Sequence, residues 1–134
     1  MLIGAGGAGS AIADALAEAG ARTLTIFDRH EDKADVLARR VAQFHPKCVA
    51  RAGRATVKGI DLLINASPTG MAAGDGLPVA LESFGNELFV ADIIPRSEPT
   101  PLLALARQCG CRTMAGPAMV AGQAEAILRF FGMV

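Results

Sequence analysis

The chain has 134 residues, of which 51% are hydrophobic and 19% charged, with neither Trp nor Tyr. This composition is typical of one well-buried α/β domain and excludes a disordered chain or a coiled coil. Thirteen basic residues balance thirteen acidic ones, so no net field favours nucleic acid or an anionic membrane. No apolar run reaches the ~18 residues of a membrane span, and the start lacks the basic flank of a signal peptide. We therefore expect a cytoplasmic protein.

Short β-rich runs alternate with helical patterns, which predicts a doubly wound parallel sheet of Rossmann type with helices on both faces. We expect strands at residues 1–3, 23–28, 48–52, 60–66, 88–94 and 111–115, and helices at residues 8–19, 31–44, 101–109 and 117–131. No repeat or linker divides the chain, so residues 1–134 form one dinucleotide-binding domain. Only three residues precede Gly4, whereas strands usually have ~5–6. Because the first strand of such a sheet is central, we expect it to be truncated here and the natural polypeptide to extend upstream.

The first turn carries the pattern Gly-x-Gly-x-x-Gly at Gly4, Gly6 and Gly9, between a strand and an amphipathic helix. In a dinucleotide-binding unit the first glycine makes the turn, the second lets the backbone approach the pyrophosphate, and the third lets helix pack on strand. The free amides and positive dipole of the helix start would face the phosphates. Asp28 ends the second strand about 20 residues further on, where it would bind the ribose hydroxyls. A purely structural glycine turn is the alternative.

Two downstream segments hold polar residues at informative places. Residues 65–71 follow a buried strand, at the sheet edge where open α/β folds bind ligands, although an ordinary strand-to-loop exit has the same composition. Gln123 lies on an apolar helical stripe with Met119 and Ile127. A buried amide needs a hydrogen-bond partner, which is a ligand or a backbone group unless Gln123 lies at the exposed edge of the stripe.

The cysteines and histidines suggest no metal site. Cys48, Cys109 and Cys111 form no Cys-x-x-Cys pair, and His30 and His45 have no ligand spacing, so we expect free reduced thiols. The lysines Lys33, Lys47 and Lys58 each lie in a polar stretch, where a solvated side chain is expected, and we assign none of them as catalytic.

Five segments in the same order resemble motifs of the shikimate/quinate dehydrogenase family, specifically its C-terminal nucleotide-binding domain. Residues 4–8, Gly-Ala-Gly-Gly-Ala, resemble its glycine loop, and residues 28–33 lie where the family often has Asn-Arg-Thr and a basic residue. Residues 61–71 resemble its motif DLLINATPxGM. Asp92 with residues 100–103 resembles DxxYxPxxTPLL, and Gly116 with Met119 and Gln123 resembles GxxMLVxQ. The resemblance covers essentially the whole chain.

This resemblance implies hydride transfer between NAD(P) and a cyclic hydroxy acid such as shikimate or quinate. It implies cofactor contacts from Gly4, Ala5, Gly6, Gly7, Ala8, Gly9, Asp28, Arg29, Lys33, Ser67, Thr69, Ile93 and Gly116, and a substrate contact from Gln123. The family's catalytic Lys–Asp pair belongs to an N-terminal substrate domain that nothing in these residues matches. We therefore expect no catalytic residue in this chain and a missing N-terminal domain as its partner, with a homodimer also compatible.

The preferred cofactor and substrate depend on three positions. Asp28 replaces the family's usual Asn and would accept from a free 2′-hydroxyl but repel a 2′-phosphate, which favours NAD. Arg29 keeps the position that clamps the 2′-phosphate of NADP, although it could equally stack on adenine or be a solvated charge. Pro95 stands where the family often has a Tyr that helps hold the substrate carboxylate. The alternatives are therefore NADP as cofactor, a related reductase for a different acid, and a nucleotide sensor without catalysis.

Overall fold

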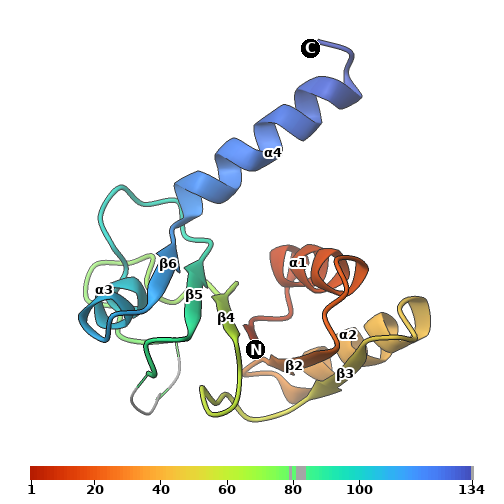
Figure 1. Cartoon of the computed structure of the whole chain (residues 1–134), viewed down its shortest axis with the longest axis horizontal. Helices are drawn as coiled ribbons and strands as arrows, with labels where there is room; N and C mark the ends of the chain where they lie inside the picture. The colour runs from red at the N-terminus through yellow and green to blue at the C-terminus, as the bar shows by residue number, and fades with distance from the viewer. Residues whose placement is uncertain (79, 81–83, 134) are drawn as a thin grey trace.

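The computed structural model describes residues 1–78, 80 and 84–133, with the side chains of residues 125 and 126 excepted. Its described strands form one all-parallel sheet in the order β3-β2-β1-β4-β5-β6 (Figure 1). The strands are β1 (Leu2–Ile3), β2 (Thr23–Phe27), β3 (Val49–Ala52), β4 (Leu62–Asn65), β5 (Phe89–Asp92) and β6 (Arg112–Met114), and the helices are α1 (Gly7–Glu18), α2 (Glu31–Phe44), α3 (Pro101–Gln108) and α4 (Gly116–Phe130). The predicted doubly wound fold is confirmed, and each predicted element ends within two residues of the observed one.

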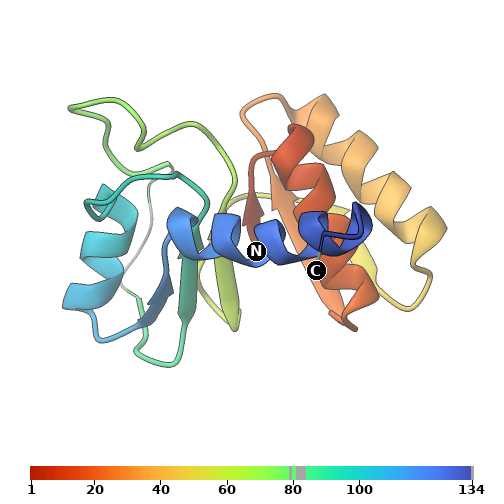
Figure 2. The same ribbon diagram turned by 90° about the horizontal axis from the view of Figure 1, so that it is seen from above.

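Two apolar clusters cover the two faces of the sheet. Helices α1 and α2 pack on one face and α3 packs on the other (Figure 2). Because successive side chains of a strand point to opposite faces, Leu2 joins the first cluster and Ile3 the second, as do Ile64 and Leu63 of β4. This two-sided burial explains why the central strands are continuous apolar runs.

Local signals in the sequence set the ends of several helices. Helix α2 has Glu31 and Asp32 in its first turn, where acidic groups offset the positive dipole end. Helix α3 begins with a proline, and the side chain of Thr100 accepts a hydrogen bond from the Leu103 amide, which satisfies a free donor of its first turn. Gly20 follows α1 with a φ of +93°, a left-handed conformation that glycine adopts without strain.

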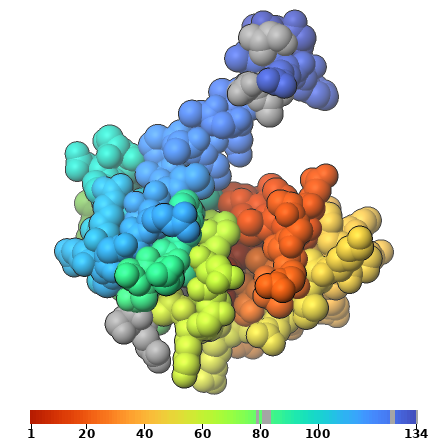
Figure 3. Space-filling model, viewed as in Figure 1, coloured from red at the N-terminus to blue at the C-terminus, as the bar shows by residue number. Residues whose placement is uncertain are grey.

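Helix α4 leaves the body of the molecule instead of packing along the sheet (Figures 1 and 3). The side chains of Val120, Ile127, Phe130 and Phe131 are 50%, 54%, 85% and 69% exposed. The apolar stripe of this helix is therefore largely exposed in this chain. None of the helices in the described part of the chain is long and apolar enough to cross a membrane.

Candidate dinucleotide-binding site

Three segments far apart in the sequence meet at the carboxyl ends of β1, β2 and β4. They are the glycine turn (residues 4–9), the β2–α2 turn and the loop that follows β4. They enclose a hollow of about 210 Å³, which we call the edge hollow. Its lining residues are Ile3, Gly4, Gly6, Asp28, Arg29, His30, Lys33, Ala66, Ser67, Pro68, Thr69 and Pro78. Seven of the predicted cofactor residues line this one hollow: Gly4, Gly6, Asp28, Arg29, Lys33, Ser67 and Thr69.

The glycines of the turn divide into two kinds. Gly4 has a φ of +100°, and a Cβ at this position would lie 2.7 Å from the carbonyl carbon of Ala66. A Cβ at Gly9 would overlap the carbonyl oxygen of Gly4. Gly6 and Gly7 are exposed, and among the described residues no atom lies within 4 Å of a Cβ built on either. The fold therefore requires Gly4 and Gly9, whereas Gly6 and Gly7 leave the start of α1 open to a ligand.

Asp28 connects the glycine turn to the β2–α2 turn. One carboxylate oxygen accepts a hydrogen bond from the Ala5 amide at 2.8 Å, and the other accepts one from the His30 amide at 2.9 Å. Partial burial opposes ionisation, but the Ala5 and His30 amides, with the nearby charges of Lys33 and His30, outweigh it and lower the pKa of Asp28. Asp28 is thus ionised and links the two turns by hydrogen bonds. Its oxygens still have lone pairs for further donors.

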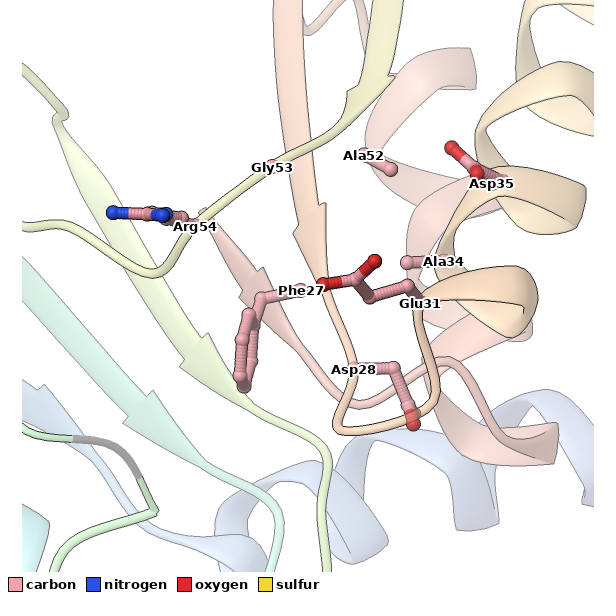
Figure 4. Close-up of a pocket in the computed structure, with 8 residues that line it drawn as sticks. All are labelled: Phe27, Asp28, Glu31, Ala34, Asp35, Ala52, Gly53 and Arg54. Carbon is pink, nitrogen blue, oxygen red and sulfur yellow. The ribbon is translucent and has the colours of Figure 1, made fainter.

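Two different hollows border Asp28, one lined by basic groups and the other by further carboxylates. Arg29, His30 and Lys33 line the edge hollow with Asp28. A second hollow of about 220 Å³ also borders Asp28, and it contains the carboxylates of Glu31 and Asp35. We call it the acidic hollow; its other lining residues are Phe27, Ala34, Ala52, Gly53 and Arg54. Arg54 points away from the three carboxylates (Figure 4). Neither Glu31 nor Asp35 was predicted as a site residue: Glu31 lies in the first turn of α2, where an acidic residue is expected from the helix dipole alone, and no motif of the sequence includes Asp35.

The loop after β4 takes its shape from buried Asn65. The amide group of Asn65 donates to the Thr69 carbonyl at 3.1 Å. Its side-chain oxygen accepts from the Ser67 amide at 3.1 Å and from the Ser67 hydroxyl at 2.7 Å. The Ser67 hydroxyl in turn accepts from the Thr69 amide at 3.3 Å. One buried side chain therefore fixes the wall of the edge hollow that Ser67 and Thr69 form.

Buried Asp92 extends this hydrogen-bond network to the neighbouring strand and to α3. Asp92 lies opposite Asn65 in the sheet and accepts from its amide group at 3.1 Å. It also accepts from the Ile94 amide at 3.2 Å and from the Thr100 hydroxyl at 2.7 Å. Burial raises the pKa of Asp92, and the hydrogen bonds from Thr100, Ile94 and Asn65 offset only part of that effect. The network joins the loop after β4, the end of β5 and the start of α3.

Asp75 and Arg96 form a second group of hydrogen bonds, which fixes residues 70–72 of the same loop. Asp75 accepts from the amides of Gly70 and Ala72 at 2.9 and 3.0 Å, and the Ala72 and Gly70 amides lower the pKa of Asp75. The guanidinium of Arg96 donates to the Gly70 carbonyl at 3.0 Å. Pro95, which stands where the family often has a tyrosine, is exposed and directly precedes Arg96.

The other predicted site residues lie outside the lining of the edge hollow. Ala5 and Gly7 border an adjoining hollow that also contains Lys33 and Arg40, and Ala8 is exposed on α1. Gly116 is buried where α4 begins, and a Cβ there would lie 2.5 Å from the Ile93 carbonyl oxygen. Gln123 is exposed on α4, so the alternative of an exposed amide holds for this chain. Lys33, Lys47 and Lys58 are all exposed, as expected.

Known proteins of one family are similar to this chain in sequence and in fold. Residues 1–94 match the family model described as shikimate / quinate 5-dehydrogenase. The shikimate dehydrogenase (NADP(+)) of Pseudarthrobacter chlorophenolicus is 38% identical over 134 residues, which cover 96% of this chain and 46% of that protein. The chain thus spans about half the length of the curated relatives it matches.

Two solved structures are also similar. The 5-ketofructose reductase of a Gluconobacter strain aligns with a TM-score of 0.84 and 34% identity, over 96% of this chain and 48% of that chain. The quinate dehydrogenase of Corynebacterium glutamicum, solved in complex with NAD, aligns with a TM-score of 0.81 and 31% identity, over 98% of this chain and 49% of that chain. From its sequence motifs, its sheet order and these matches, the chain belongs to the shikimate/quinate 5-dehydrogenase family.

Proposed function

We propose that this chain is the nucleotide-binding domain of a dehydrogenase that transfers hydride between a nicotinamide cofactor and a cyclic hydroxy acid of shikimate or quinate type. The observation that carries the proposal is the convergence of three segments on the edge hollow. An open helix start, an ionised Asp28 and a loop fixed by Asn65 lie at the carboxyl edge of a parallel sheet. Such an edge is where open α/β folds bind nucleotides.

Each part of the cofactor has a proposed partner in this arrangement. The diphosphate contacts the open backbone at Gly6 and Gly7, where α1 begins. Asp28 accepts hydrogen bonds from the adenosine ribose, and Arg29 lies against the adenine. Ser67 and Thr69 face the nicotinamide half, with Ile93 and Gly116 beyond them. The cofactor supplies the hydride, and the protein orients the cofactor and one wall of the substrate cleft.

We propose NAD as the preferred cofactor, with NADP as the alternative. Asp28 is ionised, and the Glu31 and Asp35 carboxylates of the acidic hollow add negative charge on its other side. These charges disfavour a 2′-phosphate at the ribose. Arg29 and Lys33 in the edge hollow act in the opposite direction, and the relatives include proteins named for either cofactor.

The reaction requires a second domain in this proposal. An N-terminal substrate domain supplies the catalytic lysine and aspartate, and it covers the exposed apolar surface of α4. Gln123 on that helix then faces the substrate and binds one of its hydroxyls. The free thiols of Cys48, Cys109 and Cys111 fit the reducing cytoplasm. A homodimer is the alternative way of covering the apolar surface of α4.

A second candidate is a related reductase with a different substrate. Pro95 replaces the tyrosine that would help to hold a substrate carboxylate, and the similar 5-ketofructose reductase is named for a neutral sugar derivative. A substrate panel with the two-domain enzyme separates the candidates. Turnover of shikimate or quinate supports the first, and turnover of only another acid or a polyhydroxylated ketone supports the second.

Cofactor binding is tested directly on the 134-residue chain by urea unfolding with and without NAD or NADP. A ligand at 100 times its dissociation constant stabilises the folded state by about 2.7 kcal/mol. We expect NAD to give this shift, and we expect the isolated chain to show negligible dehydrogenase turnover. Absence of a shift with both cofactors contradicts the proposal, and robust turnover by the isolated chain contradicts the assignment of catalysis to a second domain. Cofactor binding with no turnover by the two-domain protein on any substrate would instead indicate a sensor.

A further inference from the structure

We propose that His30 is a specificity-determining residue of the edge hollow, whose protonated imidazole binds a 2′-phosphate and makes the choice between NAD and NADP depend on pH. This role rests on the proposed function, because the adenosine ribose has to bind beside Asp28. His30 is not among the residues predicted to bind the cofactor. Its position, its side chain and the charges near it support the assignment.

His30 ends the β2–α2 turn and directly precedes α2. Its amide donates to the Asp28 carboxylate at 2.9 Å, which holds His30 beside the group proposed to bind the ribose. His30 also lines the edge hollow, together with Arg29 and Lys33. A phosphate on a ribose that is bound to Asp28 would therefore enter the same hollow as the imidazole.

The side chain of His30 does not cap the helix that follows it. A residue at this position often accepts a hydrogen bond from an amide of the first helical turn, but among the described residues no such amide donates to the His30 side chain. The residue is exposed, and its carbonyl accepts from the Lys33 amide at 3.0 Å. The chain's other histidine, His45, instead contacts the Asp14 carboxylate at 2.7 Å. The His30 ring can therefore contact a ligand without loss of a helix cap.

The charges near the imidazole come from the β2–α2 turn and the first turn of α2. The charged residues within three positions of His30 are Asp28, Arg29, Glu31, Asp32 and Lys33. The glycine turn and the loop after β4 add no titratable side chain to the described lining of the edge hollow. Three carboxylates and two cations leave one net negative charge, which disfavours a 2′-phosphate. A protonated imidazole cancels this charge and offers an N–H donor on each ring nitrogen.

Histidine changes its charge between about pH 5 and 8, and a protonated imidazole binds phosphate through a charge-assisted hydrogen bond. NAD has only a hydroxyl group at the 2′ position, so it gains little from the added charge. Acidification should therefore raise the affinity for NADP relative to that for NAD. The 2′-phosphate itself takes up a proton near pH 6, which affects every variant alike, so variants compared at one pH separate the two titrations.

Two substitutions fix the charge at this position. His30→Gln is neutral and His30→Arg is positive at both about pH 6 and about pH 8. Titrations with NAD and NADP at each pH give the ratio of NADP to NAD affinity. We expect this ratio to be about fivefold higher in His30→Arg than in His30→Gln, the upper end for one exposed ion pair. The wild-type ratio should match that of His30→Gln at the higher pH and approach that of His30→Arg at the lower pH.

His45→Gln is the matched control, because it removes the other histidine and should leave the pH dependence of the wild-type ratio unchanged. Urea midpoints at both pH values check that every variant is folded. Equal ratios in His30→Gln and His30→Arg would overturn the inference, as would a wild-type ratio that follows the same variant at both pH values or loss of the pH dependence in His45→Gln. If the wild-type chain binds neither cofactor, the proposed function fails as well. If NAD binds and only the pH dependence is absent, the role of His30 alone is rejected.

Discussion

A methyl group added at Gly6 is expected to weaken cofactor binding with little change in the free energy of unfolding. A methyl group added at Gly9 is expected to lower the free energy of unfolding. Gly6 precedes α1 with φ −81° and ψ −163°, a conformation that any L-residue adopts. Among the described residues, no atom lies within 4 Å of a Cβ at Gly6. A Cβ at Gly9 would instead overlap the Gly4 carbonyl oxygen, which is backbone and has little freedom to move.

The geometry sets the expected magnitudes. The Gly6→Ala change restricts the unfolded chain, which stabilises by about 0.4–1 kcal/mol, and loses some capping quality, which costs a similar amount. We therefore expect the free energy of unfolding to stay within about 1 kcal/mol. The new methyl group blocks the diphosphate from the start of α1. Loss of two charge-assisted hydrogen bonds at about 1.5 kcal/mol each weakens binding about 150-fold, and Gly6→Val should abolish measurable binding.

The Gly9→Ala change is the matched control. Overlap with the Gly4 carbonyl forces the turn to move, which destabilises by about 1–3 kcal/mol. Urea unfolding and NAD titration of both variants measure the two quantities separately. Wild-type affinity for NAD in Gly6→Ala would refute the proposed approach of the phosphates, and wild-type stability in Gly9→Ala would refute the close packing of α1 on the turn.

Three further predictions concern other parts of the molecule. Asp28→Asn removes the negative charge beside the ribose, so the ratio of NADP to NAD affinity should rise, and an unchanged ratio in paired titrations would count against the ribose assignment. Asp92→Ala removes the acceptor of the buried Thr100 hydroxyl, of the Ile94 amide and of one of the two N–H groups of the Asn65 side chain, which should cost about 3 kcal/mol in urea unfolding, whereas Asp92→Asn should cost much less. Because the folded state raises the pKa of Asp92, stability should fall as the pH rises above about 4, through the folded pKa, and Asp92→Asn should remove this fall; an identical pH profile in the variant would refute the assignment. Replacing both Phe130 and Phe131 with Ser should leave the free energy of unfolding of this chain within about 0.5 kcal/mol, because both rings are exposed, and a loss above 2 kcal/mol would show that α4 packs on the domain.

The order and type of the elements could be predicted because their signals are local. Helix α2 has the predicted bounds, since acidic residues mark its start and His45-Pro46 follows its end. The strand predicted from Ile60 begins instead at Leu62. Ile60 is apolar and lies just upstream of the strand, but pairing with the neighbouring strand begins only at Leu62. The bounds of a strand depend on its partners, and the sequence of that segment does not contain them.

The residues proposed to bind the cofactor were also identified in part from local patterns. The glycine spacing separates Gly4, Gly6 and Gly9 by their roles, and the structure shows the close contacts at Gly4 and Gly9 and the open space at Gly6. The hydrogen bonds from the Ala5 and His30 amides to Asp28 were not predicted, nor was the network of Asn65, Asp92 and Thr100. Asn65 and Asp92 are 27 positions apart, and nothing in either segment indicates that they become neighbours in the sheet.

The sequence by itself determined the alternation of strands and helices and the places where the chain must turn, because hydrophobic periodicity and glycine or proline act over a few residues. Only the tertiary structure decided which polar groups meet and which apolar surfaces stay exposed. Helix α4 shows the difference: its sequence favours burial, yet Phe130 and Phe131 are largely exposed. A segment is buried only where another surface is present to exclude water. The sequence of the segment does not specify that other surface.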